Sequence, residues 1–203
     1  MHAAEQERAD VKARRAAWRQ DLADVPAEKL VFIDESGAST SLQRLRGRSP
    51  RGQRCVASGP AGHWKVATMI GAVRIDGPLT CATLDGAVDG ATFLAWVAEG
   101  LCPLLRPGDV VVMDNLSAHR SPGVRAAIEA VGAGLMYLPP YSPDFNPIEN
   151  MWSKVKEALR SAAARALETL GIAITAAITS VTAEDCLGFF QNCGYATEDH
   201  KLL

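Results

Sequence analysis

Three acidic residues stand where an α/β protein can place metal ligands. Asp34 follows the apolar run 31–33, Asp114 follows the apolar run 110–113, and Glu149 lies in the first turn of an expected helix. Open α/β sheets bind ligands where buried strands end. If the two strands are neighbours, the aspartates face each other across about 5 Å, and like charges that close need a proton or a cation between them. Carboxylate oxygens suit Mg²⁺ or Mn²⁺, so the pattern predicts a magnesium site.

Each acid also has a purely structural interpretation. Asp34 could cap a loop, and Asp114 could begin an Asx-turn with Asn115. Glu149 could complete a capping box with Asn146 at the start of its helix. The three acids taken together favour the metal site. A zinc site is not expected, because the four histidines (2, 63, 119 and 200) show no ligand-type spacing.

Apolar runs and caps predict a mixed sheet of five strands flanked by helices, which is an α/β fold class. Strands are expected over residues 30–36, 66–77, 79–86, 109–115 and 134–139. Helices are expected over residues 3–22, 89–104, 122–132, 146–166, 167–178 and 182–194, and residues 37–65 are expected to be a loop or an irregular hairpin. The expected domains are an N-terminal helix and linker (1–29), a catalytic domain (30–165) and C-terminal helices packed on it (166–203).

Charge is segregated along the chain. The net charge of −2 argues against a uniformly basic nucleic-acid binder, yet residues 36–75 hold seven basic side chains and no acidic one. Residues 76–114 hold six acids and one arginine. This division allows one surface to hold an anionic polymer while carboxylates gather elsewhere, although a solvated arginine-rich loop would look the same.

Composition excludes several classes of protein. No window approaches the roughly 18 apolar residues of a membrane span, and the highly charged N-terminus is not a secretory signal. The five cysteines are scattered and odd in number, so they are expected to be reduced and the protein to be cytoplasmic.

Longer strings around the acids are more specific. FIDES, DN-x₃-H and LPPYSPDFNPIE, with 34 residues between Asp114 and Glu149, resemble the catalytic core of DDE transposases of the mariner-like superfamily, in its bacterial insertion-sequence branch. The resemblance covers residues 1–195. It implies an RNase H-like fold in which Asp34, Asp114 and Glu149 bind two Mg²⁺ ions, with Mn²⁺ as a substitute.

The resemblance also implies an activity and its partners. Such an enzyme cuts DNA at transposon ends and transfers the freed 3′ ends into target DNA at TA sites, here during transposition of an insertion sequence. DNA is the expected partner and a homodimer the expected assembly. Asn115, His119 and Lys156 are expected to orient a ligand or meet a phosphate beside the acids. The residues expected to contact the DNA backbone are Arg44, Arg46, Arg48, Arg51, Arg54, Lys65 and Lys154.

The chain departs from the family pattern in one respect. Full transposases of this type carry helix-turn-helix modules before the catalytic domain, whereas a single expected helix precedes the first strand here. We therefore expect the second reading frame of a frameshifted element or a truncated copy, with a separate helix-turn-helix subunit from an upstream frame to recognise the transposon ends.

Three other functions share parts of this pattern. They are an RNase H-like nuclease without strand transfer, an inactive fragment that binds DNA or an intact transposase, and a receiver-like phosphoacceptor domain. The last fits poorly, because it requires a lysine after its last strand and no acid on the following helix.

Overall fold

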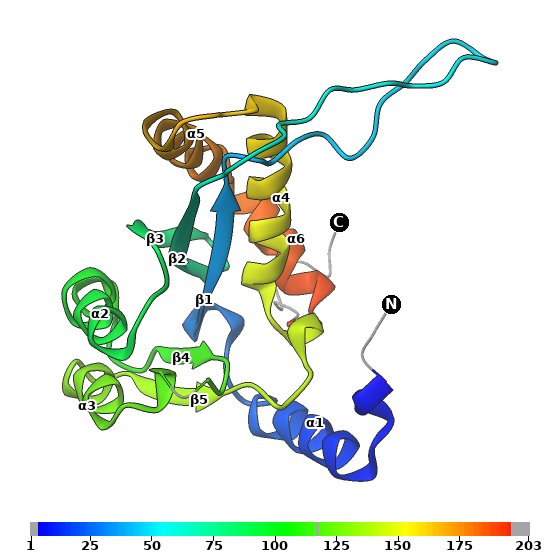
Figure 1. Ribbon diagram of the computed structural model, residues 1–203. Coiled ribbons are helices and arrows are strands. Elements are labelled where there is room, and N and C mark those ends of the chain that lie inside the picture. The colour runs from blue at the N-terminus through cyan, green and yellow to red at the C-terminus, as the bar shows by residue number, and fades with distance from the viewer. Residues whose placement is uncertain (1–3, 117, 196–203) are drawn as a thin grey trace.

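The computed structural model describes residues 4–116 and 118–195, and these residues form one mixed sheet with helices on both faces (Figure 1). Its strands are β1 (Leu30–Ser39), β2 (Val66–Arg74), β3 (Gly77–Asp85), β4 (Val110–Met113) and β5 (Gly134–Tyr137). The strand order is β3-β2-β1-β4-β5, with β1–β2 and β2–β3 antiparallel and β1–β4 and β4–β5 parallel. The five expected strands and their mixed pairing are confirmed.

β1 is longer than the strand expected over residues 30–36. The last β1–β4 pair joins Phe32 to Val112, but β2 continues to pair with β1 as far as Ser39. Strand conformation persists because these backbone groups keep partners on β2. Asp34 therefore lies inside β1 rather than close to its end, at the level where β4 has finished.

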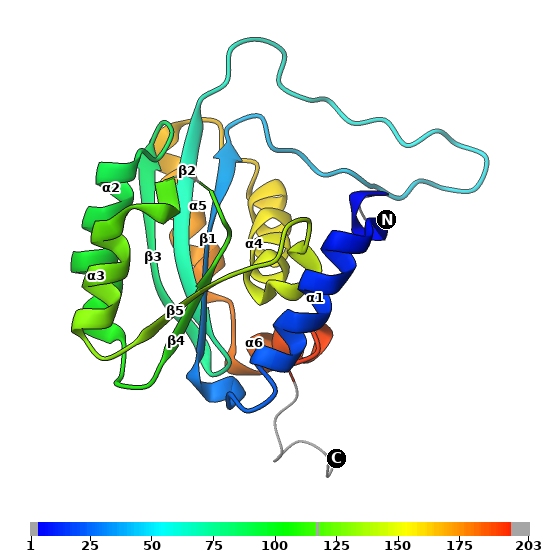
Figure 2. The ribbon, with the colours of Figure 1, turned by 90° about the horizontal axis from the view of Figure 1, so that it is seen from below.

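Helices cover both faces of the sheet (Figure 2). The α-helices are α1 (Ala9–Asp21), α2 (Gly90–Ala95), α3 (Pro122–Ala130), α4 (Pro147–Ala162), α5 (Leu167–Thr179) and α6 (Ala183–Asn192). Short 3₁₀ turns are η1 (Ala4–Glu7), η2 (Ala27–Lys29), η4 (Cys102–Leu104), η5 (Ala118–Arg120) and η6 (Pro143–Phe145), and η3 (Trp96–Leu101) is π-helical. Helices α2 and α3 lie on one face, and α4, α5 and α6 lie on the other.

Several helix ends follow the capping expected from the sequence. Asp89 accepts a hydrogen bond from the backbone N–H of Thr92 at 2.8 Å and begins α2. Thr182 and Asp185 form a reciprocal capping box at the start of α6. Gly194 has a φ of 84° just after α6 ends, a conformation that glycine adopts without strain.

Within the described residues, no single helix is long and apolar enough to span a membrane. Only α5 and α6 taken together reach the required length and composition, and they are bent by 79° at their junction.

Alternate side chains of β1 belong to two hydrophobic cores, one on each face of the sheet. Phe32 packs with residues of α4, α5 and α6, whereas Val31 and Ile33 pack with residues of α2, η3 and α3. Because successive strand residues point to opposite faces, Asp34 lies on the face covered by α4 and Glu35 on the face covered by α2 and α3. The two adjacent acids are thereby separated by the sheet.

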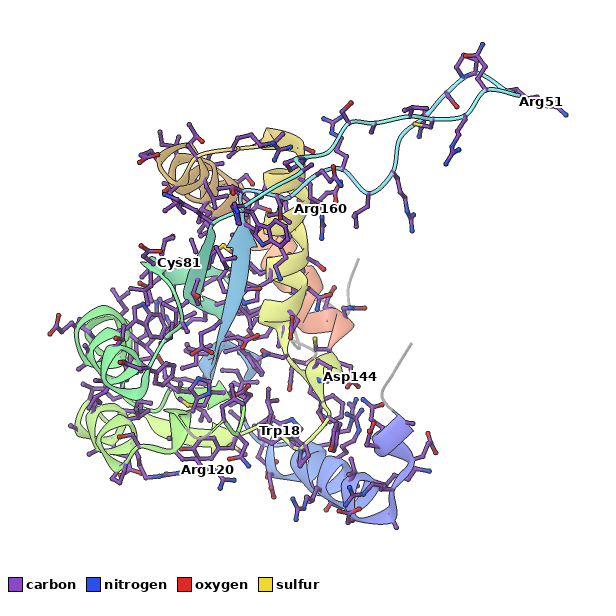
Figure 3. The ribbon with its side chains drawn as sticks, viewed as in Figure 1. Trp18, Arg51, Cys81, Arg120, Asp144 and Arg160 are labelled. Atoms are coloured by element: carbon purple, nitrogen blue, oxygen red, sulfur yellow. The ribbon has the colours of Figure 1, made fainter. Side chains whose placement is uncertain are left out.

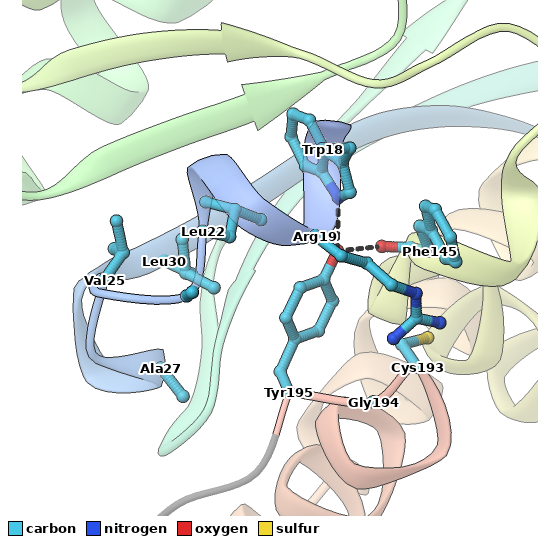
Figure 4. Close-up of a pocket in the computed structure, with 11 residues that line it drawn as sticks. Trp18, Arg19, Leu22, Val25, Ala27, Leu30, Phe145, Cys193, Gly194 and Tyr195 are labelled. Carbon is cyan, nitrogen blue, oxygen red and sulfur yellow. Dashed lines mark hydrogen bonds between the residues drawn. The ribbon is translucent and has the colours of Figure 1, made fainter. Parts of the chain in front are cut away.

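Helix α1 is fastened to the turn that precedes α4. Arg15 forms an ion pair with Asp144 at 2.6 Å, donates to the Ser142 hydroxyl at 2.7 Å, and lies over the Phe145 ring at 4.0 Å. A pocket between α1 and the end of α6 is closed by Tyr195, whose hydroxyl donates to the Phe145 carbonyl oxygen at 2.7 Å (Figure 4). These contacts give the turn before α4 a fixed position.

Residues 41–65, between β1 and β2, extend away from the body of the protein as a long arm (Figures 1 and 2). Arg51 lies at its far end (Figure 3). The arm is largely exposed, including Leu45, Val56 and Trp64. It is a loop of two extended segments, which agrees with the expectation of a loop or irregular hairpin at this position.

Candidate active site

One pocket of the structure is lined by all three predicted acids. Asp34 comes from β1, Asp114 from the residue after β4, and Glu149 from the first turn of α4. The other lining residues belong to the segment after β4 and to the Pro-rich turn before α4; they are Asn115, Leu116, Leu138, Pro139, Pro140, Tyr141, Ser142, Pro143 and Asn146. Neither lysine nor arginine occurs among these described lining residues, so the pocket is negatively charged.

The sheet register places the two aspartates side by side. The last β1–β4 pair is Phe32 with Val112, and Asp34 and Asp114 each lie two residues further along. Burial, followed by the nearby charge of Glu149, raises the pKa of Asp34 to about 7. The backbone N–H of Glu35 donates to Asp34 Oδ1 at 2.9 Å and opposes this rise. Asp34 is therefore an acid that a nearby cation would stabilise in its ionised form.

Asp114 has two partners, and both approach the same oxygen. Its Oδ1 accepts from the backbone N–H of Leu116 at 3.1 Å, which is the Asx-turn considered from the sequence, and lies 2.5 Å from His119 Nδ1. Burial raises the pKa of Asp114, but these hydrogen bonds outweigh it and hold the pKa below its usual value. Within the described residues, Oδ2 of Asp114 has no hydrogen-bond partner, and it remains open to a ligand.

His119 is fully enclosed at the end of β4. Its second nitrogen, Nε2, lies 2.9 Å from Glu35 Oε1, and its ring stacks on Phe93 with centroids 4.2 Å apart. Burial lowers the pKa of His119, but the hydrogen bonds to Asp114 and Glu35 raise it to about 10. Both ring nitrogens are then protonated, and each donates to a carboxylate. A direct contact between His119 and a phosphate is not supported, because the side chain is 1% exposed.

The Glu149 carboxylate does not take part in a cap at the start of α4. Asn146 occupies the N-cap position of α4 but makes no side-chain cap, so the capping box considered for Asn146 and Glu149 is not formed. Pro147 occupies the first position of the helix, which needs no backbone N–H donor there. Glu149 is exposed at the pocket, where it can turn toward a ligand.

The donor chemistry of the pocket fits a hard divalent cation, because its described lining includes three carboxylates and neither histidine nor cysteine. The carboxylates do not yet converge. Within the described residues, no group of three or more His, Cys, Asp or Glu side chains is arranged closely enough to hold a metal ion. Asp34 and Asp114 are anchored by hydrogen bonds, so the exposed Glu149 is the side chain that has to move.

The accessory residues predicted beside the acids are not all near the pocket. Asn115 lines it and accepts a hydrogen bond from Arg120. Lys156 lies two turns beyond Glu149 on α4 and does not line the pocket. Lys154 forms an ion pair with Asp185 of α6, so it joins two helices instead of facing the acids.

The basic residues predicted to contact DNA are gathered on the arm. Six of the seven, all but Lys154, lie there and are exposed: Arg44, Arg46, Arg48, Arg51, Arg54 and Lys65. Arg74, the seventh basic residue of the positive stretch, is instead buried and forms an ion pair with Asp109 at 2.5 Å. The exposed basic residues of the stretch 36–75 therefore all lie on the arm, and Arg74 pairs with an internal carboxylate.

Sequence reasoning missed two residues that shape this site. Glu35 belongs to the FIDES string, but it points to the face of β1 opposite to Asp34. Arg15 lies in an N-terminal helix with no visible link to the Pro-rich turn in sequence. The alternation of strand side chains could have singled out Glu35, whereas no local signal identifies Arg15.

A comparison with known protein families shows to which family the chain belongs. Residues 29–171, more than half of the sequence, match the family described as DDE superfamily endonuclease. The chain belongs to this family. The matched range contains all three pocket acids and the arm. No curated protein matches the sequence significantly.

Several solved structures of similar fold come from one transposase, Mos1. The Mos1 transposase paired-end complex with left transposon end has a TM-score of 0.76 at 16% identity, covering 95% of this chain and 60% of that one. The Mos1 mariner paired-end complex with Mn has a TM-score of 0.72 at 16% identity, with 92% and 60% covered. The catalytic domain of Mos1 mariner transposase has a TM-score of 0.67 at 13% identity, with 96% and 92% covered.

These matches confirm the RNase H-like fold expected for this DDE endonuclease domain. The chain spans about three-fifths of the length of the transposase chains in the complexes but nearly all of the separate catalytic domain.

Proposed function

We propose that this DDE domain is the catalytic part of a mariner-like transposase of the bacterial insertion-sequence branch. It cuts DNA strands at transposon ends and joins the freed 3′ ends to target DNA at TA sites. The observation that carries the proposal is the pocket shared by Asp34, Asp114 and Glu149, whose described lining residues include no basic side chain. Three acids from distant parts of the chain line one pocket, and only Asp114 has a cationic partner, His119, so cations stabilise the ionised form of the other two.

We assign the metal-binding role to these three acids. Two Mg²⁺ or Mn²⁺ ions bound there would supply the positive charge needed to activate the attacking water or 3′ hydroxyl and to stabilise the leaving oxygen. Asp34 and Asp114 provide fixed oxygens on neighbouring strands, and Glu149 closes the set from α4. The reaction needs no covalent protein nucleophile, so the chain contributes position and charge. Mos1 structures that contain Mn and Mg support this choice of ions.

The arm is assigned to the phosphate backbone of DNA. Its six exposed basic residues project well away from the pocket and are free of acidic neighbours in sequence. Structures of Mos1 paired-end and strand-transfer complexes support transposon-end DNA as the partner. We assign specific recognition of those ends to helix-turn-helix modules outside this chain, and a homodimer to the working assembly.

Replacement of one acid tests the metal site. Asp114→Asn keeps the size of the side chain but removes its charge, so Mn²⁺-dependent nicking of supercoiled plasmid should fall at least about a hundredfold. Asp76→Asn, the same change at an exposed turn, is the matched control and should nick at the wild-type rate. Wild-type nicking by a folded Asp114→Asn protein would contradict the assignment.

A strand-transfer assay with pre-cut transposon ends distinguishes a transposase from a simple nuclease. Given DNA with a free 3′ hydroxyl and a TA-containing target, the wild-type chain, supplemented with its end-recognition module, should form covalently joined products. Nicked target without joined products would instead indicate an RNase H-like nuclease.

The arm is tested by the dependence of DNA affinity on salt. Replacing Arg44, Arg46 and Arg48 by alanine should weaken DNA binding and reduce the slope of log affinity against log salt by about 3, since each lost phosphate contact contributes about 1. The matched control removes three exposed arginines from the body of the protein, at positions 8, 14 and 125. An unchanged slope in the arm variant would assign the arm to contacts between subunits.

A further inference from the structure

The ring of His119 connects the pocket to a carboxylate that is not part of it. Nδ1 lies 2.5 Å from Asp114 Oδ1, and Nε2 lies 2.9 Å from Glu35 Oε1. Asp114 lines the pocket, whereas Glu35 is absent from its described lining and points to the opposite face of β1. A continuous chain of hydrogen bonds therefore runs from one face of the sheet to the other, around the end of β4.

The contacts of His119 hold its ring in one orientation. Phe93 stacks on one side at a centroid distance of 4.2 Å, and the Tyr137 hydroxyl donates to the His119 carbonyl oxygen at 3.1 Å. The side chain is 1% exposed, so water cannot replace a lost hydrogen-bond partner without rearrangement. Glu35, with 18% of its side chain exposed, is the partner that fixes the far nitrogen of the ring.

The orientation of His119 in turn sets the orientation of Asp114. His119 and the Leu116 backbone N–H both contact Oδ1. The other oxygen of the carboxylate, Oδ2, therefore has no hydrogen-bond partner among the described residues. A histidine that orients a ligand and is itself oriented by a carboxylate is a known way in which proteins tune metal sites, and loss of such an outer partner lowers metal affinity or activity by about 10–100-fold.

We propose that Glu35 is a positioning residue, which acts through His119 to hold the Asp114 carboxylate with Oδ2 available to a divalent cation. This inference rests on the proposed function, because it takes the pocket to be the metal site. Glu35 touches neither the cation nor DNA. Without it, the buried Nε2 donor of His119 has no partner, so the ring turns and Asp114 loses its fixed orientation.

The test measures Mn²⁺ binding to the protein alone, by electron paramagnetic resonance, in parallel with plasmid nicking. Glu35→Ala should raise the Mn²⁺ dissociation constant about tenfold. Glu35→Gln retains an oxygen that accepts from Nε2 and should restore most of the affinity. Glu129→Ala, an exposed acid of α3, is the control and should bind Mn²⁺ like the wild type.

A double-mutant cycle asks whether Glu35 acts through His119. If it does, Glu35→Ala combined with His119→Ala should bind Mn²⁺ no more weakly than His119→Ala alone. Thermal unfolding of every variant shows whether it is folded, and Glu35→Gln provides the comparison if either alanine variant is not.

The outcomes separate this inference from the proposed function. A wild-type protein that binds no Mn²⁺ would overturn both. Wild-type Mn²⁺ binding together with an unchanged constant in Glu35→Ala, or with additive effects in the double variant, would overturn the positioning role alone. A loss of Mn²⁺ affinity in Glu35→Ala that Glu35→Gln restores, together with a non-additive double variant, would establish it.

Discussion

Replacing Asp34 by asparagine should stabilise the metal-free protein while abolishing its activity. Burial and the charge of Glu149 raise the pKa of Asp34 to about 7, whereas an unfolded aspartate titrates near 3.8. Between these values the folded protein binds more protons than the unfolded chain, so wild-type stability falls as pH rises. The asparagine side chain has the same size and no charge, so the stability of the Asp34→Asn variant would lack this dependence on pH.

The size of the effect follows from the two pKa values. A carboxyl that titrates at 3.8 unfolded and at about 7 folded loses about 1.5 kcal/mol of folding free energy by pH 5 and about 4 kcal/mol by pH 8. The stability advantage of Asp34→Asn over wild type should therefore grow by about 2.5 kcal/mol from pH 5 to pH 8. Water entering the pocket reduces this value, which is an upper limit.

Urea unfolding at pH 5 and pH 8, without divalent ions and then with Mg²⁺, measures this difference. Taking wild type minus variant at each pH cancels the other titrating groups, which both proteins share. Mg²⁺ should stabilise the wild type at pH 8 and leave Asp34→Asn nearly unchanged, because the cation replaces the missing counter-charge. A pH-independent difference, or equal stabilisation of both proteins by Mg²⁺, would refute this account of Asp34.

Three further substitutions test the supports of the site. Arg15→Ala should lower stability by about 1 kcal/mol and slow plasmid nicking at saturating Mg²⁺, because the turn before α4 loses its ion pair and ring contact; an unchanged rate would show that α1 does not help to position the turn. Gly71→Ala would place a Cβ 2.9 Å from the Trp152 ring, which should cost about 1–3 kcal/mol in urea unfolding, and a smaller loss would mean that Trp152 can shift. Arg74→Met removes the closest cation of the buried Asp109 and leaves only Lys29, at 3.9 Å, so it should cost about 3–5 kcal/mol in thermal or urea unfolding at pH 7. Near-wild-type stability would show that Lys29 replaces Arg74 as the partner of Asp109.

The framework of the fold could be predicted from local sequence because its signals are local. Apolar runs indicated the buried strands, and the cap at Asp89 and the capping box at Thr182 indicated two helix starts. The end of β1 could not be found in this way. Its extension from residue 36 to Ser39 depends on pairing with β2, whose residues lie more than 25 positions further along the chain.

The contacts that support the site could not be predicted from local sequence either, because they join residues that are far apart in the chain. Glu35 and His119 are 84 positions apart, and Arg15 and Ser142 are 127 positions apart. Nothing in the sequence near His119 indicates which carboxylate its second nitrogen would meet. Lys154 shows the reverse case, because a lysine beside the pocket in sequence turns to Asp185 of another helix when α4 and α6 pack.

The distribution of cations explains why the pocket stays negative in a nearly neutral protein. Two basic side chains near the pocket acids or the turn before α4 are bound to other acids, Arg15 to Asp144 and Lys154 to Asp185. Six exposed basic side chains lie on the arm, which extends away from the body (Figure 1). His119 is the exception, but its charge is shared between Asp114 and Glu35, so it fixes one pocket acid without neutralising the other two. Asp34 and Glu149, which have no such partner among the described residues, are left for ions from solution to neutralise.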